Sequence, residues 1–542
     1  MSFREWIPKP EAEEGRSASW TRRRMILALV AGALSGALAA IACSVPALCW
    51  LGWIALVPLL LVLPQERGRN SALVGLVSGA SMAAVMLHWV PLAVAAMGGS
   101  WLGGASALTA LAVCWGGQVA AFAWAISWLR KRLRKSLSAR AMTVVTLVVT
   151  PALWIALEYT FTSWCAWASV ICYIALGCSQ WPLPVMIQSA AWGGMYGLSF
   201  MLVLFSAGIA LAVGKRKPWV LAISTGAALL FVLAGWWRLS RNAAGSGDRP
   251  VRVALLQANV RSIRNIDKQA AGYVANCHLK LLPEIRKARP ELVVWSEGAV
   301  PWVIREDDDL VRCMITGLRP LEPCHLVGAI SEAPPGSEAA IGAPAYVLLP
   351  DGRITDQYYK TRPVLFAETG PRSLGKWLRV RLSTVGEKGL VGAGHRLEPL
   401  RSPVGTVGVV ICNEILYPDM GRTLVRKGAE IMANMANGVR LKSRWARNQL
   451  FGVSVLRAVE TGRDTMVANN SGISGVIDAF GRVKVRSEPL DRVCLAADVH
   501  RREGRTAYVS GGDWFAWTCL LGCLAAFACA WGRPRLTAWA RR

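Results

Sequence analysis

Three side chains that could carry out covalent catalysis each stand at the end of a predicted strand. Glu297 ends "LVVWSE", Lys360 ends "QYYK" and Cys412 ends "VGVVIC". A cysteine attacks as a thiolate, and a nearby cation or base activates it. A carboxylate can take the thiol proton and later deprotonate a second substrate, and a lysine ammonium can stabilise the oxyanion of a tetrahedral intermediate. Together the three residues predict a cysteine nucleophile at the edge of a sheet.

Each of these residues also has an ordinary structural interpretation. A free cysteine at the end of a strand is usually part of the core, and a glutamate or lysine just after a strand is usually solvated. Taken one at a time, the structural interpretation is the better one. The occurrence of all three residues, each in a distinctive local sequence, favours the catalytic interpretation.

The elements that must position these residues lie in a region of ordinary globular composition, residues 251–503. The segment 345–360 is a predicted hairpin that turns at Asp351-Gly352. Strands that alternate with helices, together with hairpins, predict an α/β sandwich of about 255 residues. We predict strands in segments 251–260, 291–297, 325–330, 345–360, 404–412, 430–438 and 465–483, and helices near 267–288, 307–319 and 444–461.

The rest of the chain is too apolar for a soluble protein. Hydrophobic residues make up 54% of the 542 residues, and the mean hydropathy is +0.36. A bilayer core requires a helix of roughly 20 apolar residues. The apolar segment 163–185 holds Gly177, Pro182, Pro184 and many aromatic residues, so we predict a re-entrant or interfacial loop there and not a span. We predict eight spanning helices, near 25–43, 46–63, 72–97, 102–129, 142–160, 186–213, 218–237 and 515–532.

The net charge of +27 follows a pattern along the chain. Lys and Arg gather before the first span and in alternate connections, whereas no Lys or Arg occurs between residues 141 and 214. By the positive-inside rule, both termini are cytoplasmic, and seven spans then place residues 251–503 on the far side of the membrane. The basic residues are scattered over short loops, which argues against a nucleic-acid partner.

The chain therefore divides into four predicted parts. Residues 1–241 form seven membrane helices, 242–250 a linker, 251–503 the extracytoplasmic catalytic domain, and 504–542 the last helix with a basic cytoplasmic tail. Arg22–Arg24 before an apolar run could also begin a signal peptide, but the run is long and further spans follow. None of the 14 cysteines forms a C-x-x-C motif, so neither a zinc site nor a thioredoxin-type site is predicted.

The sequences around the three residues resemble motifs of the nitrilase superfamily, whose members use a Glu-Lys-Cys triad on an α-β-β-α sandwich. Within it, the chain resembles the integral-membrane apolipoprotein N-acyltransferase family over nearly its whole length. The resemblance is carried by "VVWSEGAVPW" (293–302), "YYKTRPVLFAETGP" (358–371), "ICNEILYP" (411–418), "NNSGISGVIDAFGRV" (469–483), "TAYVSGGDW" (506–514), "LHWVPLAVAAMGG" (87–99), "PALWIALEY" (151–159) and "GCSQ" (177–180).

The resemblance assigns a role to particular residues. It implies that Cys412 is the nucleophile, Glu297 the proton acceptor and Lys360 the oxyanion stabiliser. Supporting or substrate-binding residues are then Glu368, Asn413, Glu414, Glu158 and Trp302. The chain departs from the family pattern at Asn413, where tyrosine is usual, and at "NGVRL" (437–441), where the pattern reads N-D-A-W-F.

The resemblance also implies a reaction. A phospholipid would donate an acyl chain to the cysteine as a thioester, and the N-terminal amine of diacylglyceryl-cysteine on an apolipoprotein would accept it. This is the last step of bacterial lipoprotein maturation, at the inner membrane, and it needs no cofactor or metal. The fold implied is an α-β-β-α sandwich inserted between the seventh and eighth helices of an eight-helix transmembrane domain.

Two other functions compete with this one. A membrane-anchored nitrilase-type amidase would use water as the acceptor, and it would not need eight spans. The other is a transporter or scaffold with an inactive enzyme domain. An ion-coupled transporter would be expected to carry charged residues within its spans, but almost none occur, and the complete set of Glu297, Lys360 and Cys412 argues against an inactive domain.

Overall fold

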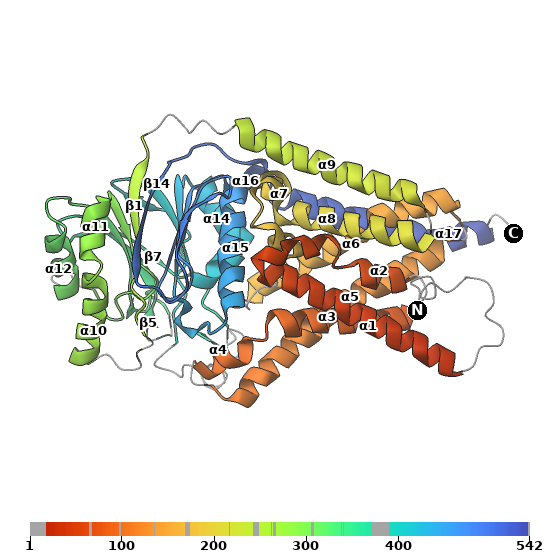
Figure 1. Ribbon diagram of the computed structural model, residues 1–542, viewed down its shortest axis with the longest axis horizontal. Coiled ribbons are helices and arrows are strands. Elements are labelled where there is room, and N and C mark those ends of the chain that lie inside the picture. The colour runs from red at the N-terminus through yellow and green to blue at the C-terminus, as the bar shows by residue number, and fades with distance from the viewer. Residues whose placement is uncertain are drawn as a thin grey trace.

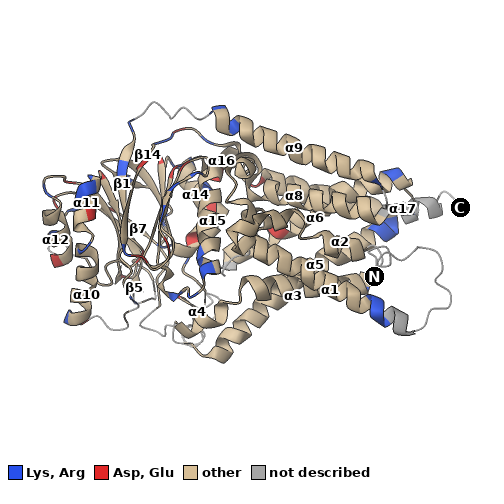
Figure 2. Cartoon of the chain, in the orientation of Figure 1, with Lys and Arg blue, Asp and Glu red and all other residues tan. Residues whose placement is uncertain are grey.

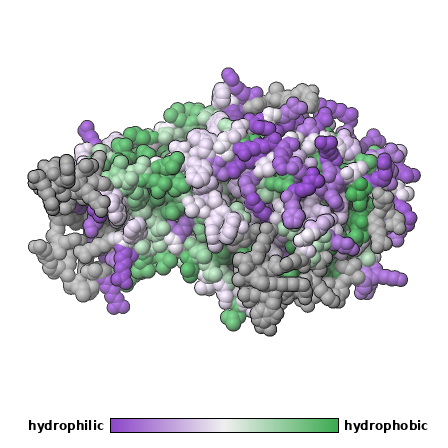
Figure 3. All heavy atoms as spheres, turned by 180° about the vertical axis from the view of Figure 1, so that it is seen from behind, coloured by the Kyte–Doolittle hydropathy of each residue, from purple (hydrophilic) through white to green (hydrophobic). Residues whose placement is uncertain are grey.

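The computed structural model divides into a helical half and a half built around two β-sheets (Figure 1). It describes residues 18–63, 68–96, 99–134, 136–168, 174–215, 217–241, 249–261, 263, 267–304, 308–337, 339, 341–365, 367–369 and 390–539. Hydrophobic side chains cover the visible surface of the helical half, whereas hydrophilic ones dominate the sheet half (Figure 3). The uneven composition of the sequence therefore corresponds to two structural parts.

The sheet half is a sandwich with two six-stranded sheets inside and helices outside (Figure 1). One apolar core lies between the sheets, and another lies between the first sheet and the helices on its outer face. The first sheet has the order β14 (Val493–Val499), β1 (Val251–Gln257), β2 (Leu292–Val294), β3 (Cys324–Gly328), β6 (Pro344–Leu348), β7 (Ile354–Tyr359). The second has the order β13 (Val483–Arg486), β12 (Gly475–Ile477), β11 (Thr465–Asn469), β10 (Ile431–Ala436), β9 (Gly405–Ile411), β8 (Leu400–Ser402).

The outer helices complete the layers, so the predicted α/β sandwich is confirmed. The first sheet is covered by α10 (Lys268–Leu279), α11 (Leu282–Ala288) and α12 (Asp309–Gly317), and the second by α14 (Pro418–Arg426) and α15 (Arg444–Thr461). The pair β4 (Ser331–Glu332) and β5 (Ile341–Gly342) lies outside both sheets. The short 3-10 helices η6 (Cys412–Leu416) and η7 (Gly438–Arg440) follow strands of the second sheet.

Parallel strands bring the predicted chemistry to one edge of each sheet. In the second sheet, β9, β10 and β11 pair in parallel up to their last residues, so the residues that follow, Cys412, Asn437 and Asn470, share an edge. In the first sheet, β1, β2 and β3 are parallel, and Glu297 follows β2. The antiparallel step through β6 gives β7 the direction of β3, which brings Lys360 to the same edge.

Six helices of the described chain are long and apolar enough to cross a membrane, or seven if the bent pair α3 and α4 is one span. The helical half contains α1 (Ala18–Ser44), η2 (Pro46–Trp53), α2 (Val57–Val62), α3 (Gly68–Met86), α4 (Val90–Ala96), α5 (Trp101–Leu133), α6 (Ala139–Ala168), η4 (Leu176–Gln180), α7 (Pro184–Ile187), α8 (Ala190–Lys215), α9 (Pro218–Arg241), α16 (Ala507–Gly511) and α17 (Trp514–Trp539). The predicted span at 46–63 is not one continuous α-helix. It is a 3-10 helix with a kink at Leu48, followed by a short α-helix that carries Pro58 in its first turn.

The broken segment 46–63 nevertheless carries the chain back along the bundle. Helices α1 and α3 pack in parallel, since Gly32 faces Val74 and Gly36 faces Ser78 four residues further along both helices. A Cβ atom at Gly36 would lie 2.0 Å from the carbonyl oxygen of Ser78, so glycine permits this close approach. The segment between two parallel helices must return to the starting side. The count of eight spans stays a prediction.

The predicted interfacial loop at 163–185 differs from the structure. Helix α6 continues to Ala168, and Trp164 and Trp167 are exposed on its last turns. The 3-10 helix η4 is buried in the protein. Glu158 of α6 holds it in place, because the backbone N–H of Leu176 donates to Glu158 Oε1 at 2.9 Å. The remaining residues of the expected loop, 169–173, lie outside the described residues.

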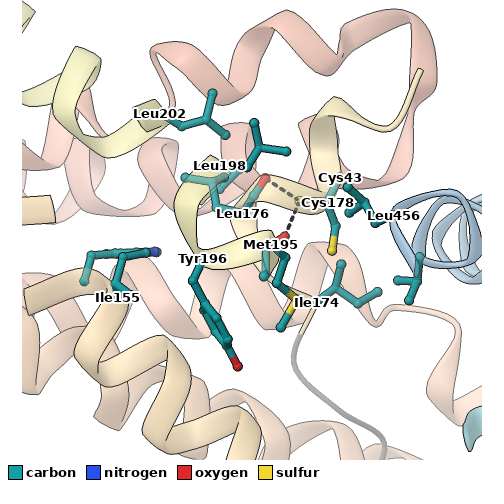
Figure 4. Packing of buried hydrophobic residues seen from close by; sticks show 14 of the residues in the cluster. Cys43, Ile155, Ile174, Leu176, Cys178, Met195, Tyr196, Leu198, Leu202 and Leu456 are labelled. Carbon is teal, nitrogen blue, oxygen red and sulfur yellow. Dashed lines mark hydrogen bonds between the residues drawn. The ribbon is translucent and has the colours of Figure 1, made fainter. Parts of the chain in front are cut away.

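Helix α15 joins the two halves, because one apolar core continues across both. Gln449 Nε2 of α15 donates to Ser44 Oγ at the end of α1 at 2.7 Å. Glu460 Oε1, near the other end of α15, accepts from the N–H of Met195 in α8 at 2.8 Å. Figure 4 shows residues of α1, η4, α8 and α15 packed together in this core. The two halves are therefore one packed unit.

We expect Gly194→Ala to destabilise this junction. Gly194 has φ +64°, and a Cβ atom there would lie 2.4 Å from Cε2 of Tyr508 in α16. The left-handed backbone and the clash each cost about 1–3 kcal/mol. Thermal unfolding in detergent should therefore show a melting temperature lowered by several degrees. Gly197→Ala is the matched control, since no neighbouring heavy atom lies within 4 Å of its Cβ position. Equal melting temperatures for the two variants would contradict this account.

Candidate active site

Lys360 is a buried cation between two carboxylates. Its side chain is 0% exposed, and Nζ donates to Glu297 Oε1 and to Glu368 Oε1, both at 2.8 Å. Glu368 is itself held by the backbone N–H of Val364, which donates to Oε2 at 2.8 Å. Burial by itself lowers the pKa of Lys360, but the two carboxylates outweigh it and raise this pKa well above its ordinary value. Lys360 therefore stays protonated and fixes both glutamates.

Cys412 is a protonated thiol next to a basic carboxylate. Burial, together with the carboxylate of Glu297, raises the pKa of Cys412, while Lys360 and the backbone N–H of Asn437 act in the opposite direction. Burial also raises the pKa of Glu297, and Lys360 offsets part of this increase. Proton transfer from Cys412 to Glu297 would generate the nucleophilic thiolate beside the ammonium of Lys360.

The backbone at Cys412 has a conformation that residues other than glycine rarely adopt. Its φ is +57°, at the point where β9 turns sharply into η6. Such a conformation costs of the order of 1–3 kcal/mol and persists only where the surroundings impose it. The turn presents the side chain at the edge of the sheet.

Glu414 holds the turns that carry Lys360 and Cys412. Its carboxylate is fully buried and accepts from Tyr358 Oη, from the N–H and hydroxyl of Thr361, and from the N–H groups of Arg362 and Ile411, at 2.7–3.0 Å. Four of these donors belong to the segment around Lys360, and the fifth precedes Cys412. The carboxylate therefore ties β7 of one sheet to β9 of the other.

The other predicted site residues divide into two groups. Asn413 lies beside Cys412 and donates from Nδ2 to the carbonyl oxygen of Arg362 at 3.2 Å. Trp302 donates from Nε1 to Asp308 at the start of α12 at 2.6 Å. The structure thus brings Asn413, Glu368 and Glu414 together with the three strand-end residues. It places Trp302 and the buried Glu158 among other neighbours, and their roles toward a substrate stay predictions.

A cavity of about 420 Å³ connects the site with the helical half. Its lining includes Glu297, Glu368 and Cys412. Other lining residues belong to the ends of the membrane helices and the segment before η4: Leu87, Trp89, Ala93 and Ile174. Leu416, Val439, Leu441, Ala446 and Leu450 add further apolar surface from the sheet half. The cavity volume is in the range of pockets that enclose small organic ligands.

Five polar lining residues were missed by the sequence analysis: Arg261, Asn437, Arg440, Gln449 and Asn470. Asn437 and Asn470 directly follow the parallel strands β10 and β11, so the strand-end argument that selected Cys412 could have found them. Asn437 Nδ2 donates to the carbonyl oxygen of Glu297 at 3.4 Å. Nothing in the local sequence of Arg261 or Arg440 indicates a cavity.

Comparison with known proteins matches both halves of the chain. Residues 35–208 match the family described as the apolipoprotein N-acyltransferase N-terminal domain, and residues 252–506 match the carbon-nitrogen hydrolase family. The apolipoprotein N-acyltransferase of Geobacter metallireducens is 27% identical over 93% of this chain and 95% of its own length. That of Gloeobacter violaceus is 27% identical over 95% of this chain and 97% of its own. The apolipoprotein N-acyltransferase of Azotobacter vinelandii is 27% identical over 94% of this chain and 95% of its own length.

We expect Lys360→Met to slow the alkylation of Cys412 by iodoacetamide at pH 8. The ammonium of Lys360 lowers the pKa of Cys412, and one pKa unit changes the thiolate fraction about tenfold. Mass spectrometry of digested protein measures the rate for each cysteine. The exposed Cys313 of the same domain is the internal control and should react equally in both proteins. An unchanged or faster reaction at Cys412 would show that Lys360 does not favour the thiolate.

Proposed function

The chain belongs to the apolipoprotein N-acyltransferase family of the nitrilase superfamily, and we propose that it moves a fatty acyl chain from a phospholipid to the N-terminal amine of a diacylated apolipoprotein. The observation that carries this proposal is the shared cavity. Its lining joins Cys412 and Glu297 to apolar residues at the ends of the membrane helices. An acyl chain could therefore reach the cysteine without leaving apolar surroundings, which matters because each CH₂ group moved into water costs about 0.8 kcal/mol.

The first half-reaction forms a thioester. Glu297 takes the proton of the Cys412 thiol, and the sulfur attacks the ester carbonyl carbon of the phospholipid. The oxyanion of the tetrahedral intermediate is stabilised by the ammonium of Lys360 and by the backbone N–H of Asn437. The C–O bond then breaks, and Glu297 returns the proton to the departing lysophospholipid alkoxide. The raised pKa of Glu297 suits a group that accepts and then donates one proton.

The second half-reaction forms an amide. The amine of the diacylglyceryl-cysteine attacks the thioester carbonyl carbon, and Glu297 takes a proton from the amine. The C–S bond breaks, and the sulfur leaves as a thiolate beside Lys360. The proton on Glu297 then restores the thiol. Glu368 and Glu414 are positioning residues in this proposal, since Glu368 accepts from Lys360 Nζ and Glu414 holds the turns on either side of the site.

We expect a fatty-acyl adduct on Cys412 in protein purified from membranes. Intact-protein and peptide mass spectrometry should detect it in the wild type and not in Cys412→Ala, and a diacylated lipopeptide should discharge it. Glu297→Gln should lower the rate of adduct formation by about 10²–10⁴-fold, the usual contribution of a general base. A folded protein in phospholipid that never carries the adduct would refute the acyltransferase. Discharge by water alone would favour the amidase.

The proposal includes an orientation in a bacterial inner membrane. We place the sheet half on the periplasmic side and both termini in the cytoplasm, with 251–503 inserted between the seventh and eighth spans. Two features support this placement. Because α1 and α3 pack in parallel, the segment 46–63 between them would have to recross the membrane. Most Lys and Arg of the helical half lie at the end remote from the sheets, with the last turn of α9 as an exception (Figure 2), and the positive-inside rule expects such an excess on a cytoplasmic side.

We expect Cys313 to react with a membrane-impermeant maleimide in spheroplasts, before lysis. Cys313 is exposed on α12, far from the helical half in Figure 1. The Cys313→Ser variant identifies the labelled peptide. Labelling that appears only after lysis would place the sheet half in the cytoplasm.

A further inference from the structure

Two arginines line the cavity without an assigned role. Arg261 follows β1 and Arg440 ends η7, and both side chains are exposed at the cavity. Among the residues that the structure describes, neither arginine has a hydrogen bond or an ion pair with another side chain. A guanidinium is suited to planar, bidentate recognition of carboxylate or phosphate groups.

The segments that carry the two arginines are tied to each other. Asn470 Oδ1 accepts from the N–H of Val260 at 2.8 Å, and its Nδ2 donates to the carbonyl oxygen of Val260 at 2.8 Å. The same Nδ2 donates to Asn437 Oδ1 at 3.2 Å. One asparagine side chain therefore links the residue before Arg261 to the turn that leads to Arg440. Both arginines are held at the edge of the sheets where Cys412 and Glu297 lie.

The charges around the cavity do not cancel. The carboxylates of Glu297 and Glu368 are both bonded to Lys360. With Arg261 and Arg440 the described site has three cations and two carboxylates. The excess positive charge lies with the two arginines, because the lysine is already enclosed by its acidic partners.

The arginines also lie beside the ends of the membrane helices. Helix α15 begins four residues after Arg440, and its Gln449 bonds to the ends of α1 and α3 through Ser44 Oγ and the carbonyl oxygen of Met86. The turn that bears Arg440 therefore stands where apolar helices end, which is the level of lipid headgroups. In a glycerophospholipid, the phosphate and the ester carbonyl groups are attached to one three-carbon glycerol unit. A phosphate thus stays close to the cysteine that attacks the ester.

We propose that Arg261 and Arg440 bind the headgroup phosphate of the donor lipid and give the enzyme a preference for phospholipids with a net negative charge. This inference rests on the function proposed above. Two guanidinium groups attract the phosphate of any phospholipid, but they repel the ammonium of a zwitterionic headgroup.

The test measures thioester formation on Cys412 in vesicles of phosphatidylglycerol and of phosphatidylethanolamine with identical acyl chains. We expect the wild type to react faster with phosphatidylglycerol. The double variant Arg261→Gln/Arg440→Gln should lose about tenfold of its rate with phosphatidylglycerol and less with phosphatidylethanolamine, mainly through a higher KM. Lys442→Gln is the matched control, because Lys442 is an exposed cation of the same segment that does not line the cavity.

A second measurement distinguishes an effect on the donor lipid from an effect on the acceptor peptide. Thioester formed beforehand should be discharged by a diacylated lipopeptide at the same rate in the wild type and the double variant. Equal rates with the two lipids, or equal losses in the double variant and Lys442→Gln, would overturn the proposal. A defect confined to discharge would assign the arginines to the acceptor peptide instead. Failure of the wild type to form any thioester would refute the proposed function itself, and this outcome differs from those that overturn only the role of the arginines.

Discussion

The site depends on one desolvated ammonium. A lysine without exposed surface is costly unless carboxylates surround it, and Lys360 meets this requirement with Glu297 on one side and Glu368 on the other. Satisfying its charge brings together the end of β2 and the segment that follows β7. The thiol of Cys412 then approaches from the second sheet. Because Lys360 needs carboxylate partners, it fixes the position of Glu297 relative to Cys412, the two groups that would share a proton.

A second carboxylate fixes the backbone that this arrangement needs. Glu414 accepts from five donors in the described part of the chain, and all five are hydroxyl or backbone N–H groups. Its partners lie on both sheets, and one of them directly precedes the left-handed residue Cys412. The two acids near the cysteine therefore have different physical tasks. Glu297 faces the thiol and can exchange a proton, whereas Glu414 is saturated with hydrogen bonds and is suited to hold geometry.

The sequence was most informative where chemistry and periodicity agreed. Apolar strands that end in a reactive residue predicted the sandwich and the meeting of Glu297, Lys360 and Cys412. The break in the second apolar segment was missed although Pro58 is visible in the sequence, because hydropathy alone defined that span and hydropathy does not depend on backbone hydrogen bonds. The sequence could not place Glu158, whose burial depends on a turn 18 residues further along the chain. The sequence also could not place Arg440 at the cavity, because that position follows from the tertiary structure.

Helix α15 has a further consequence for how such a chain can change over time. Although family comparison divides the chain into two modules, α15 is buried between the second sheet and the membrane helices, and its polar residues bond to α1, α3 and α8. Replacing one of these polar residues on α15 would leave a donor or acceptor at the end of a membrane helix without its partner. A catalytic module taken from another protein would therefore need matching polar residues on this helix in order to pack here.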